Sequence, residues 1–259
     1  MIDLHAHILP GLDDGPVDLE SSAALAEAAV AAGTRVMAAT SHVNLGFELS
    51  PAELAAARER VVARLAADGI PLEVVQGGEI SPNRLGALSD ADLRALTLGG
   101  GSWVLLECPF SPAAAGMELM VADLHERGFG VLLAHPERSP SFQLQPALLA
   151  ALVERGALGQ VNSASLTGEF GDAARRAAFA MVEQGLVHVL ASDAHHAVQR
   201  PPGAAPGLAA LRERFGRVGA LGEWMTEEVP AAILAGRPVP ERPPLPAKPR
   251  RGLLRRLRA

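Results

Sequence analysis

Seven short apolar runs, each followed closely by polar side chains, most of them metal-binding, constrain this 259-residue chain more than any other feature. The first run lies at the N-terminus, where His5 and His7 end the segment Ile2-Asp3-Leu4-His5-Ala6-His7. An imidazole or carboxylate at the end of a buried strand is costly unless it is neutralised or coordinated. One such run would mean little. Seven indicate a shared polynuclear metal centre and therefore hydrolytic chemistry.

The seven runs predict parallel strands, because most are continuous Val, Leu and Ala segments of the kind that are buried on both faces. The candidate strands are residues 1–5, 34–40, 72–78, 102–108, 129–135, 158–163 and 187–192. The helices expected between them cover residues 18–32, 51–68, 112–127, 146–155, 170–185 and 206–216. Repeated strand–helix units predict a closed or nearly closed parallel barrel, with an open doubly wound sheet as the alternative.

The C-terminal part of the chain has a different composition. Residues 237–249 contain six prolines, which fix φ and remove backbone donors, so this segment predicts an extended linker. We therefore expect a barrel domain over residues 1–236, and a Pro-rich linker and basic C-terminal tail over residues 237–259. The tail is either a disordered solubilising end or a segment that contacts anionic lipid at a membrane surface.

Charge and cysteine usage exclude several classes of protein. The net charge of the chain is -6. The last twelve residues carry a charge of +6, so the rest of the chain carries -12. Nucleic acid is therefore not an expected partner of the main domain. The one cysteine, Cys108, excludes an internal disulfide and fits a reducing cytoplasm. Residues 1–20 carry no basic side chain, unlike a signal peptide, and no apolar stretch reaches the roughly 20 residues of a membrane span.

The carboxyl ends of parallel strands meet on one side of a barrel, where active sites form. The segments expected there are His5 to His7, Thr40-Ser41-His42, Gly77-Gly78-Glu79, Glu107, His135-Pro136-Glu137-Arg138, Asn162-Ser163 and Ser192-Asp193-Ala194-His195. The turn Asp13-Asp14-Gly15-Pro16 follows the first strand closely enough to fold over the same mouth. Ligands that are distant in sequence would thus converge.

The residue types at these ends specify the chemistry. A mixed set of histidines and carboxylates suits Mn²⁺, Fe or Zn²⁺, and the carboxylates favour Mn²⁺. A carboxylate such as Glu79 can bridge two ions, and such ions convert water into a nucleophile near neutral pH. Arg138 is the natural phosphate clamp, because its planar guanidinium matches phosphate oxygens. Together these features predict a phosphomonoesterase.

The motifs resemble those of the polymerase-and-histidinol-phosphatase (PHP) superfamily, and more narrowly its bacterial capsule and exopolysaccharide tyrosine-protein phosphatase branch. They are Ile2-Asp-Leu-His-Ala-His-Ile-Leu-Pro-Gly-Leu-Asp-Asp-Gly-Pro16, Ala39-Thr-Ser-His42, Gly78-Glu79, His135-Pro-Glu-Arg138, Gln160-Val-Asn-Ser163 and Ser192-Asp-Ala-His195. The likeness runs from Met1 to about Pro202, and the opening motif is specific to the branch.

The resemblance implies a distorted (β/α)₇ TIM-like barrel with up to three metal ions, usually manganese. By residue, it implies a first ion on His5, His7, Glu79 and Asp193, a second on Glu79, Glu107 and His135, a third on Asp14, His42 and His195, and a phosphoryl group on Arg138 and Arg200. It implies a cytoplasmic enzyme of exopolysaccharide and capsule biosynthesis that dephosphorylates a bacterial tyrosine kinase at the inner face of the membrane. Family members often carry Arg or His directly after the residue that corresponds to His42, whereas this chain has Val43-Asn44. The preference for phosphopeptides therefore stays open.

Several alternatives stay open at this level. Asp13 competes with Asp14 as a ligand, Glu107 is also placed to cap a helix, and Arg138 is also placed to pair with Glu137 or Asp14. The runner-up function is a small-molecule phosphatase, such as one that acts on histidinol phosphate, and the third is a non-catalytic regulator that binds a partner. A cysteine phosphatase is not expected, because position 114, six residues after Cys108, is alanine.

Overall fold

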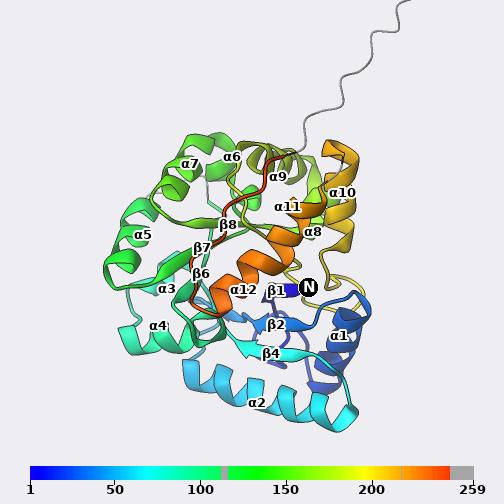
Figure 1. Cartoon of the computed structure of the whole chain (residues 1–259). Coiled ribbons are helices and arrows are strands. Elements are labelled where there is room, and N and C mark those ends of the chain that lie inside the picture. The colour runs from blue at the N-terminus through cyan, green and yellow to red at the C-terminus, as the bar shows by residue number, and fades with distance from the viewer. Residues whose placement is uncertain (112–115, 217, 246–259) are drawn as a thin grey trace, which may run out of the picture.

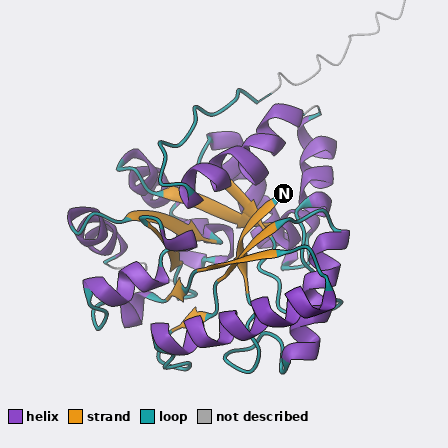
Figure 2. Cartoon of the chain, turned by 60° about the horizontal axis from the view of Figure 1, so that its bottom comes forward, coloured by secondary structure: helices purple, strands orange, loops and turns teal. Residues whose placement is uncertain are grey.

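Parallel strands lie at the centre of the molecule, with helices around their outer side (Figures 1 and 2). The computed structural model describes residues 1–111, 116–216 and 218–245. The architecture is mixed α/β, and strands occur at all seven positions predicted from the apolar runs. The strand residues are almost all buried, because helices cover the sheets from outside and side chains fill the centre.

The strands form two parallel sheets. The first has the order β1-β2-β4 and consists of β1 (Ile2–Ala6), β2 (Val36–Ala39) and β4 (Glu73–Gln76). The second has the order β3-β5-β6-β7-β8-β9 and consists of β3 (His42–Val43), β5 (Glu79–Ile80), β6 (Trp103–Glu107), β7 (Gly130–Ala134), β8 (Leu158–Asn162) and β9 (Val189–Ala191). All pairs are parallel, so the carboxyl ends of the strands lie on one side.

The chain crosses from the first sheet to the second at two interruptions. Thr40 and Ser41 separate β2 from β3, and Gly77 and Gly78 separate β4 from β5. The Thr40 hydroxyl accepts a hydrogen bond from the backbone N–H of Ala6 at 3.0 Å. It thus replaces a backbone acceptor at the point where the pairing of β1 with β2 ends. The two-residue strands beyond these interruptions were not predicted, and they carry His42 and Glu79.

The predicted closed barrel is corrected by these ladders. β1 meets the segment after β9 at one isolated bridge between Ala6 and Ala194, with backbone hydrogen bonds from His7 N–H to Ala194 and from Asp193 N–H to His5, both 2.8 Å. The described strands thus form two hydrogen-bonded sheets and no closed barrel. The physical reasons are the two interruptions and a register shift within β1.

Capping residues begin two of the helices. Asp18 caps α1 by accepting from Ser21 N–H at 2.8 Å, and Ser50 forms a capping box with Glu53 at the start of α2. The principal outer helices are α1 (Leu19–Ala31), α2 (Pro51–Asp68), α4 (Asp90–Leu96), α5 (Met117–Glu126), α7 (Pro146–Glu154), α9 (Gly171–Gln184) and α10 (Ala205–Phe215). Residues 112–115 of the predicted helix 112–127 lie outside the described residues.

Shorter helical segments connect these elements, and neither these segments nor α4 were predicted. They are α3 (Pro82–Leu85), α6 (Pro140–Leu144), α8 (Ser163–Thr167), α11 (Gly219–Glu223) and α12 (Val229–Leu234), with 3₁₀ turns η1 (Leu98–Gly100) and η2 (Pro136–Arg138) and the π-helical turn η3 (Trp224–Glu228). Two of them bear on function, because η2 carries Arg138 and α8 follows directly on β8.

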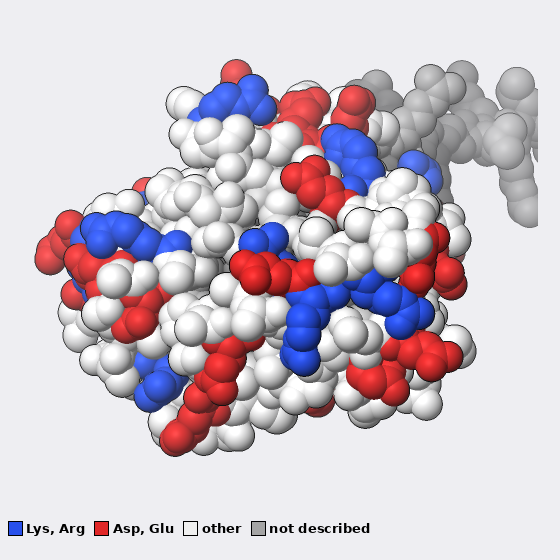
Figure 3. All heavy atoms as spheres, turned by 90° about the horizontal axis from the view of Figure 1, so that it is seen from below, with Lys and Arg blue, Asp and Glu red and all other residues white. Residues whose placement is uncertain are grey.

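The first part of the predicted linker packs on the domain. Trp224 donates its indole N–H to the carbonyl of Pro240 at 3.0 Å, and Arg242 donates to the carbonyl of Val182 at 2.8 Å. The basic tail lies outside the described residues, and the domain boundary after residue 236 stays a prediction. In the described part of the chain, no helix is both long and apolar enough to cross a membrane. On the face seen in Figure 3, basic side chains lie beside acidic ones.

Candidate metal centre

One cavity at the carboxyl ends of the strands gathers the predicted site residues. Its volume is about 190 Å³, and its lining consists of Asp14, His42, Glu79, Glu107, Phe110, His135, Arg138, Asp193, His195 and Arg200. His5 and His7 lie directly behind this lining and are fully buried. The structure therefore brings together all nine predicted metal ligands and both predicted phosphate-binding arginines.

The ligating atoms fall into four overlapping groups, each with all its atoms within 4.8 Å of one another. These groups are His7, Asp14, His42 and His195; His5, His7 and Asp193; His5, Glu79 and His135; and His42, Glu79 and Glu107. Glu79 and the histidines recur in more than one group, so neighbouring ions would share ligands. This is the arrangement of a polynuclear centre rather than of a single site.

Four atoms in the deepest part of the centre have the spacing of a coordination shell. The Nε2 atoms of His5 and His7 are 3.4 Å apart, and each lies 3.4 Å from Glu79 Oε2 and 3.5 Å from Asp193 Oδ1. Metal–ligand bonds of about 2.0–2.2 Å place the ligands of a tetrahedral ion about 3.3–3.6 Å apart. The observed spacing fits a cation bound between these four side chains.

Hydrogen bonds fix the direction of both N-terminal histidines. His7 Nδ1 donates to Asp13 Oδ2 at 2.8 Å, and His5 Nδ1 donates to the Gln160 amide oxygen at 2.9 Å. In each neutral ring, the proton on Nδ1 makes this bond, so Nε2 carries no proton and faces the cluster. Metal-binding histidines are commonly oriented by such a hydrogen bond from their other ring nitrogen. The sequence left open whether Asp13 or Asp14 is the metal ligand. In the structure, Asp13 orients His7, and Asp14 lies in a group of candidate ligands.

The loop after β1 is shaped to bring Asp14 over the mouth. Asp13 accepts from the backbone N–H groups of Gly15 and His42, both at 3.0 Å, which ties the loop to β3. A Cβ atom at Gly15 would lie 2.7 Å from the carbonyl oxygen of His7, so only glycine allows this close approach. Asp14 then lies half-exposed, with Oδ1 3.1 Å from His195 Nε2 and 3.5 Å from His42 Nε2.

Glu79 connects the groups. Its Oε1 lies 2.9 Å from His135 Nε2, and its Oε2 lies 2.9 Å from His42 Nδ1. Glu107 lies at the end of β6, is 9% exposed, and shares a group with His42 and Glu79. This placement favours a ligand role for Glu107 over helix capping.

Unpartnered polar atoms provide an independent sign that a cation fits here. Among the described residues, buried atoms that lack a hydrogen-bond partner include His42 Nδ1, Glu79 Oε2, His135 Nδ1 and His195 Nε2. Buried polar groups are normally satisfied, because an unmade hydrogen bond costs about 1–3 kcal/mol. So many of them on one cluster fit a site whose remaining partner is a metal ion.

The acids and histidines of the centre strongly perturb one another. Burial alone would raise the pKa of Glu79, but His5, His135 and His42 hold it well below its usual range. Burial alone would lower the pKa of His7, but its hydrogen bonds to Asp13 and Glu79 raise it to about 10. Glu107 is the exception, because burial and the charge of Glu79 both raise its pKa. Protons on His5 and His7, whose pKa values are both raised, would thus neutralise acids that divalent cations would otherwise neutralise.

Two of the candidate ligands have strained backbone. Of the described residues other than glycine, only His135 and Asp193 have positive φ, at 36° and 54°. The left-handed region is unfavourable for residues with a Cβ, and such strain concentrates at functional sites. In both cases it turns the chain abruptly at the end of a strand, so that the side chain faces the cavity.

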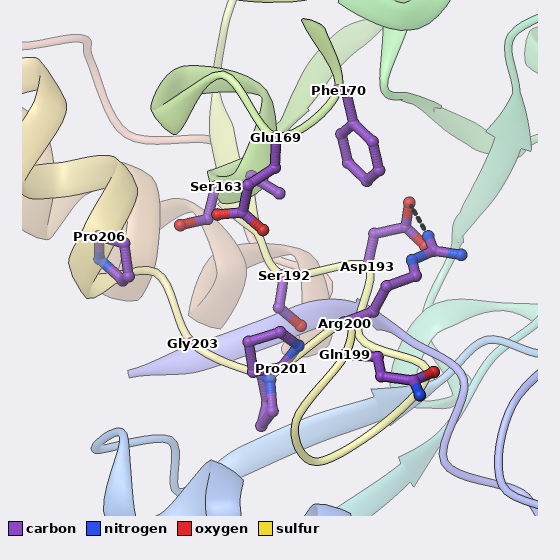
Figure 4. Close-up of a pocket in the computed structure, with 12 residues that line it drawn as sticks. Ser163, Glu169, Phe170, Ser192, Asp193, Gln199, Arg200, Pro201, Gly203 and Pro206 are labelled. Carbon is purple, nitrogen blue, oxygen red and sulfur yellow. Dashed lines mark ion pairs between the residues drawn. The ribbon is translucent and has the colours of Figure 1, made fainter.

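The two arginines share one carboxylate oxygen and one aromatic ring. Arg138 Nη1 and Arg200 Nη2 lie 2.8 Å and 2.9 Å from Asp193 Oδ2. The Phe170 ring lies 4.1 Å from the Arg138 guanidinium carbon and 5.7 Å from that of Arg200. Figure 4 shows Arg200 and Asp193 in this ion pair with Phe170 nearby, at a second cavity of about 150 Å³ that shares Arg200 and Asp193 with the metal centre.

Sequence reasoning gave no role to the buried amides of β8. Gln160 donates to the Asn162 side-chain oxygen, and Asn162 donates to Asp193 Oδ2, both at 2.7 Å. These amides therefore connect His5 to Asp193. Glu137, which the sequence offered as a partner of Arg138, instead accepts from Asn162 N–H at 3.0 Å and from Ser165 Oγ at 2.6 Å, and Arg138 pairs with Asp193. The sequence held one signal for the role of Gln160 and Asn162, because two amide side chains are unusual in a strand expected to be apolar.

Two residues have no part in the proposed chemistry. His188 accepts from Gly159 N–H at 3.2 Å, so it is a satisfied structural histidine. Cys108 is fully buried, and burial raises the pKa of its thiol, which does not suit a nucleophile.

Comparisons with known proteins find relatives that cover most of this chain. Residues 1–229 match the family model "Capsular polysaccharide synthesis, CpsB/CapC". The tyrosine-protein phosphatase YwqE of Bacillus subtilis is 36% identical over 255 residues, which cover 97% of this chain and 98% of that protein. The tyrosine-protein phosphatase CpsB of Streptococcus pneumoniae is 30% identical over 211 residues, which cover 78% and 86%.

Solved structures give the same relationship. A structure from work on YwqE of Bacillus subtilis and CpsB of Streptococcus pneumoniae, described as unique metal-dependent tyrosine phosphatases, matches with a TM-score of 0.85 and 35% identity over 96% of this chain and 100% of that one. A β-aspartyl dipeptidase from Fervidobacterium islandicum matches with a TM-score of 0.53 and 15% identity over 90% and 72%, which shows a shared fold alone.

Proposed function

The chain belongs to the CpsB/CapC family of capsular polysaccharide synthesis, and from this premise we propose that it is a metal-dependent tyrosine-protein phosphatase. The observation that carries the proposal is one cavity whose lining combines seven candidate ligands with two arginines, and behind which the candidate ligands His5 and His7 lie. Metal ligands alone would suit many hydrolases. Two guanidinium groups beside them suit a phosphate ester.

The proposed ligand sets are those expected from the sequence. His5, His7, Glu79 and Asp193 would hold one ion, Glu79, Glu107 and His135 a second, and Asp14, His42 and His195 a third. The spacings around His5, His7, Glu79 and Asp193 and around Asp14 support the first and third sets. They support the second in part, because Glu79 lies 2.9 Å from His135, whereas Glu107 groups with Glu79 and His42. The mixed nitrogen and oxygen donors support Mn²⁺, with Fe and Zn²⁺ as alternatives. When bound, such ions polarise phosphoryl oxygens and activate water for in-line attack.

The protein's own side chains would position the phosphoryl group. Arg138 and Arg200 reach the cavity from η2 and from the loop after β9, and both are anchored on Asp193. Each guanidinium keeps further N–H groups for phosphoryl oxygens, because one nitrogen is used for Asp193. The leaving phenol, with a pKa of about 10, needs less protonation than an alkyl alcohol, so no dedicated acid is required.

Hydrolysis of a phosphotyrosine peptide by metal-free protein with Mn²⁺, Fe²⁺ or Zn²⁺ added back tests the proposal. We expect phosphate release that depends on the metal and a metal content above one ion per chain. Release no greater than that of the His42→Ala variant would contradict it. Histidinol phosphate, assayed in parallel, tests the small-molecule alternative, for which no contact in the structure argues specifically.

We also propose that the physiological substrate is a phosphorylated bacterial tyrosine kinase of the capsule or exopolysaccharide system. The support is the family's role in capsular polysaccharide synthesis and the phosphatase names of the relatives. Loss of anti-phosphotyrosine signal from such a kinase, with no loss for His42→Ala, would support it. Equal binding of the kinase by metal-free and metal-loaded protein without turnover would favour a non-catalytic regulator.

The location of the protein is proposed from sequence alone. The single buried cysteine supports a cytoplasmic enzyme, and the six basic side chains after Ala247 support contact with the inner face of an anionic membrane. Truncation after Ala247 should then weaken binding to vesicles that contain phosphatidylserine. Unchanged binding would leave the tail as a solubilising end.

A further inference from the structure

Among the described residues, Phe110 is the one apolar side chain in the lining of the metal cavity. Every other lining side chain is a candidate metal ligand or a candidate phosphate-binding arginine, whereas Phe110 is apolar. It is 50% exposed, at the start of the loop that follows β6. Large aromatic rings are normally buried, so a half-exposed one at the mouth of a charged cavity offers a free apolar face to a ligand.

The position of the ring relates it directly to the phosphate-binding groups. The Arg138 guanidinium carbon lies 5.1 Å from its centroid, and the His135 ring centroid lies 5.5 Å away. The other two phenylalanines near the centre differ. Phe170 lies against both arginines and lines the neighbouring cavity, and Phe47 stacks on His42 at 5.9 Å without lining the metal cavity.

We propose that Phe110 is the surface on which the tyrosine ring of the substrate stacks, and that it selects aryl over alkyl phosphates. The inference rests on the proposed phosphatase function. In phosphotyrosine, the ester oxygen joins phosphorus directly to the ring. A phosphoryl group held by Arg138 therefore places that ring beside Phe110, where two aromatic rings pack in an offset or edge-to-face arrangement. An alkyl phosphate such as phosphoserine brings only a methylene group to the same place.

Calorimetric binding of phenylphosphonate and methylphosphonate to the Mn²⁺-loaded protein tests the proposal, because the two ligands share the phosphonate and differ in the ring. For Phe110→Ala, we expect the affinity for phenylphosphonate to fall about tenfold and that for methylphosphonate to change less than twofold. Phe110→Trp should retain the preference for the aryl ligand. Leu119→Ala is the matched control, because Leu119 is an exposed apolar residue on α5 that does not line the cavity.

The same variants should show the effect in catalysis. Phe110→Ala should raise KM for a phosphotyrosine peptide about tenfold with kcat within about threefold of the parent value. An equal loss of affinity for both phosphonates would overturn the proposal, because Phe110 would then act only by holding Arg138. Unchanged binding of both would overturn it too. Absence of hydrolysis by the parent protein, with the aryl preference intact, would instead contradict the proposed function.

Discussion

The two ends of the central strands satisfy their buried polar groups in different ways. At the amino ends, His188 accepts from Gly159 N–H, Trp224 donates to Pro240, and the chain after residue 236 packs over both. At the carboxyl ends, His42, Glu79, His135 and His195 each have a buried atom that makes no well-formed hydrogen bond, although His42 Nδ1 lies 2.9 Å from Glu79 Oε2. The two groups named at the first end are satisfied within the protein. At the second end, the remaining partners would be the metal ions that we propose.

The comparison teaches that stability and chemistry are concentrated at opposite ends of the same strands. A change at the carboxyl ends should reduce metal binding and turnover while the fold persists. A change at the amino ends should reduce the free energy of unfolding and leave the turnover of the folded molecules unchanged. Four changes test this separation.

Glu79→Gln should give the largest effect, because Glu79 contacts His5, His7, His42 and His135. We expect phosphatase activity to fall at least about 10³-fold, with loss of bound metal. Steady-state kinetics and metal analysis measure these two quantities, and thermal unfolding of the metal-free protein should remain cooperative. If the variant bound as much metal as the parent but had a lower free energy of unfolding, the separation of the two ends would be wrong.

Trp224→Ala tests the opposite end. Trp224 is 1% exposed, so its truncation should lower the free energy of unfolding by about 3–4 kcal/mol. Urea denaturation measures this loss, and kcat per folded molecule should stay within about twofold of the parent value. Trp224→Phe, which keeps a ring but loses the hydrogen bond to Pro240, should cost only about 1 kcal/mol.

Titration of His188 provides a pH-dependent test of the same end. Burial, together with the charge of Arg242, lowers its pKa from 6.5 to about 4. The unfolded chain therefore takes up the proton first, and the free energy of unfolding should fall by up to about 3 kcal/mol as the pH drops from 6.5 to 4. His188→Gln keeps an acceptor for Gly159 and should flatten this part of the profile. Parallel profiles for parent and variant would refute the assignment.

The amides of β8 should give the smallest effect, because they act through the ligands. Gln160→Leu removes the acceptor for His5 Nδ1 and should weaken metal binding about 10- to 100-fold. Saturating metal should restore most of kcat. Gln160→Glu keeps the acceptor and should lose less affinity, whereas a purely structural role would make the two variants equally defective in metal binding.

The seven longer strands and six of the helices were predictable because their signals are local. Continuous apolar runs and the capping residues Asp18 and Ser50 determine those elements from neighbours in sequence. The β3 and β5 strands were not predictable, because Thr40-Ser41 and Gly77-Gly78 have the composition of chain breaks. The predicted closed or nearly closed barrel is not confirmed in its closed form, because closure depends on the register between β1 and the end of β9, which composition does not encode.

The candidate site divides in the same way. Histidines and acids at strand ends are recognisable by type, so the ligand candidates could be named. The separate roles of Asp13 and Asp14 depend on the shape of one loop, and adjacent aspartates look alike in sequence. Phe110 and Phe170 resemble ordinary core residues until their distances from Arg138 are measured.

The left-handed backbone at His135 and Asp193 has a consequence for how this protein could decay over evolutionary time. Glycine at either position would relax the main chain and remove a candidate ligand in one substitution. A lineage freed from selection for hydrolysis would tolerate such glycines. Their presence in a homologue would identify a scaffold that has given up catalysis.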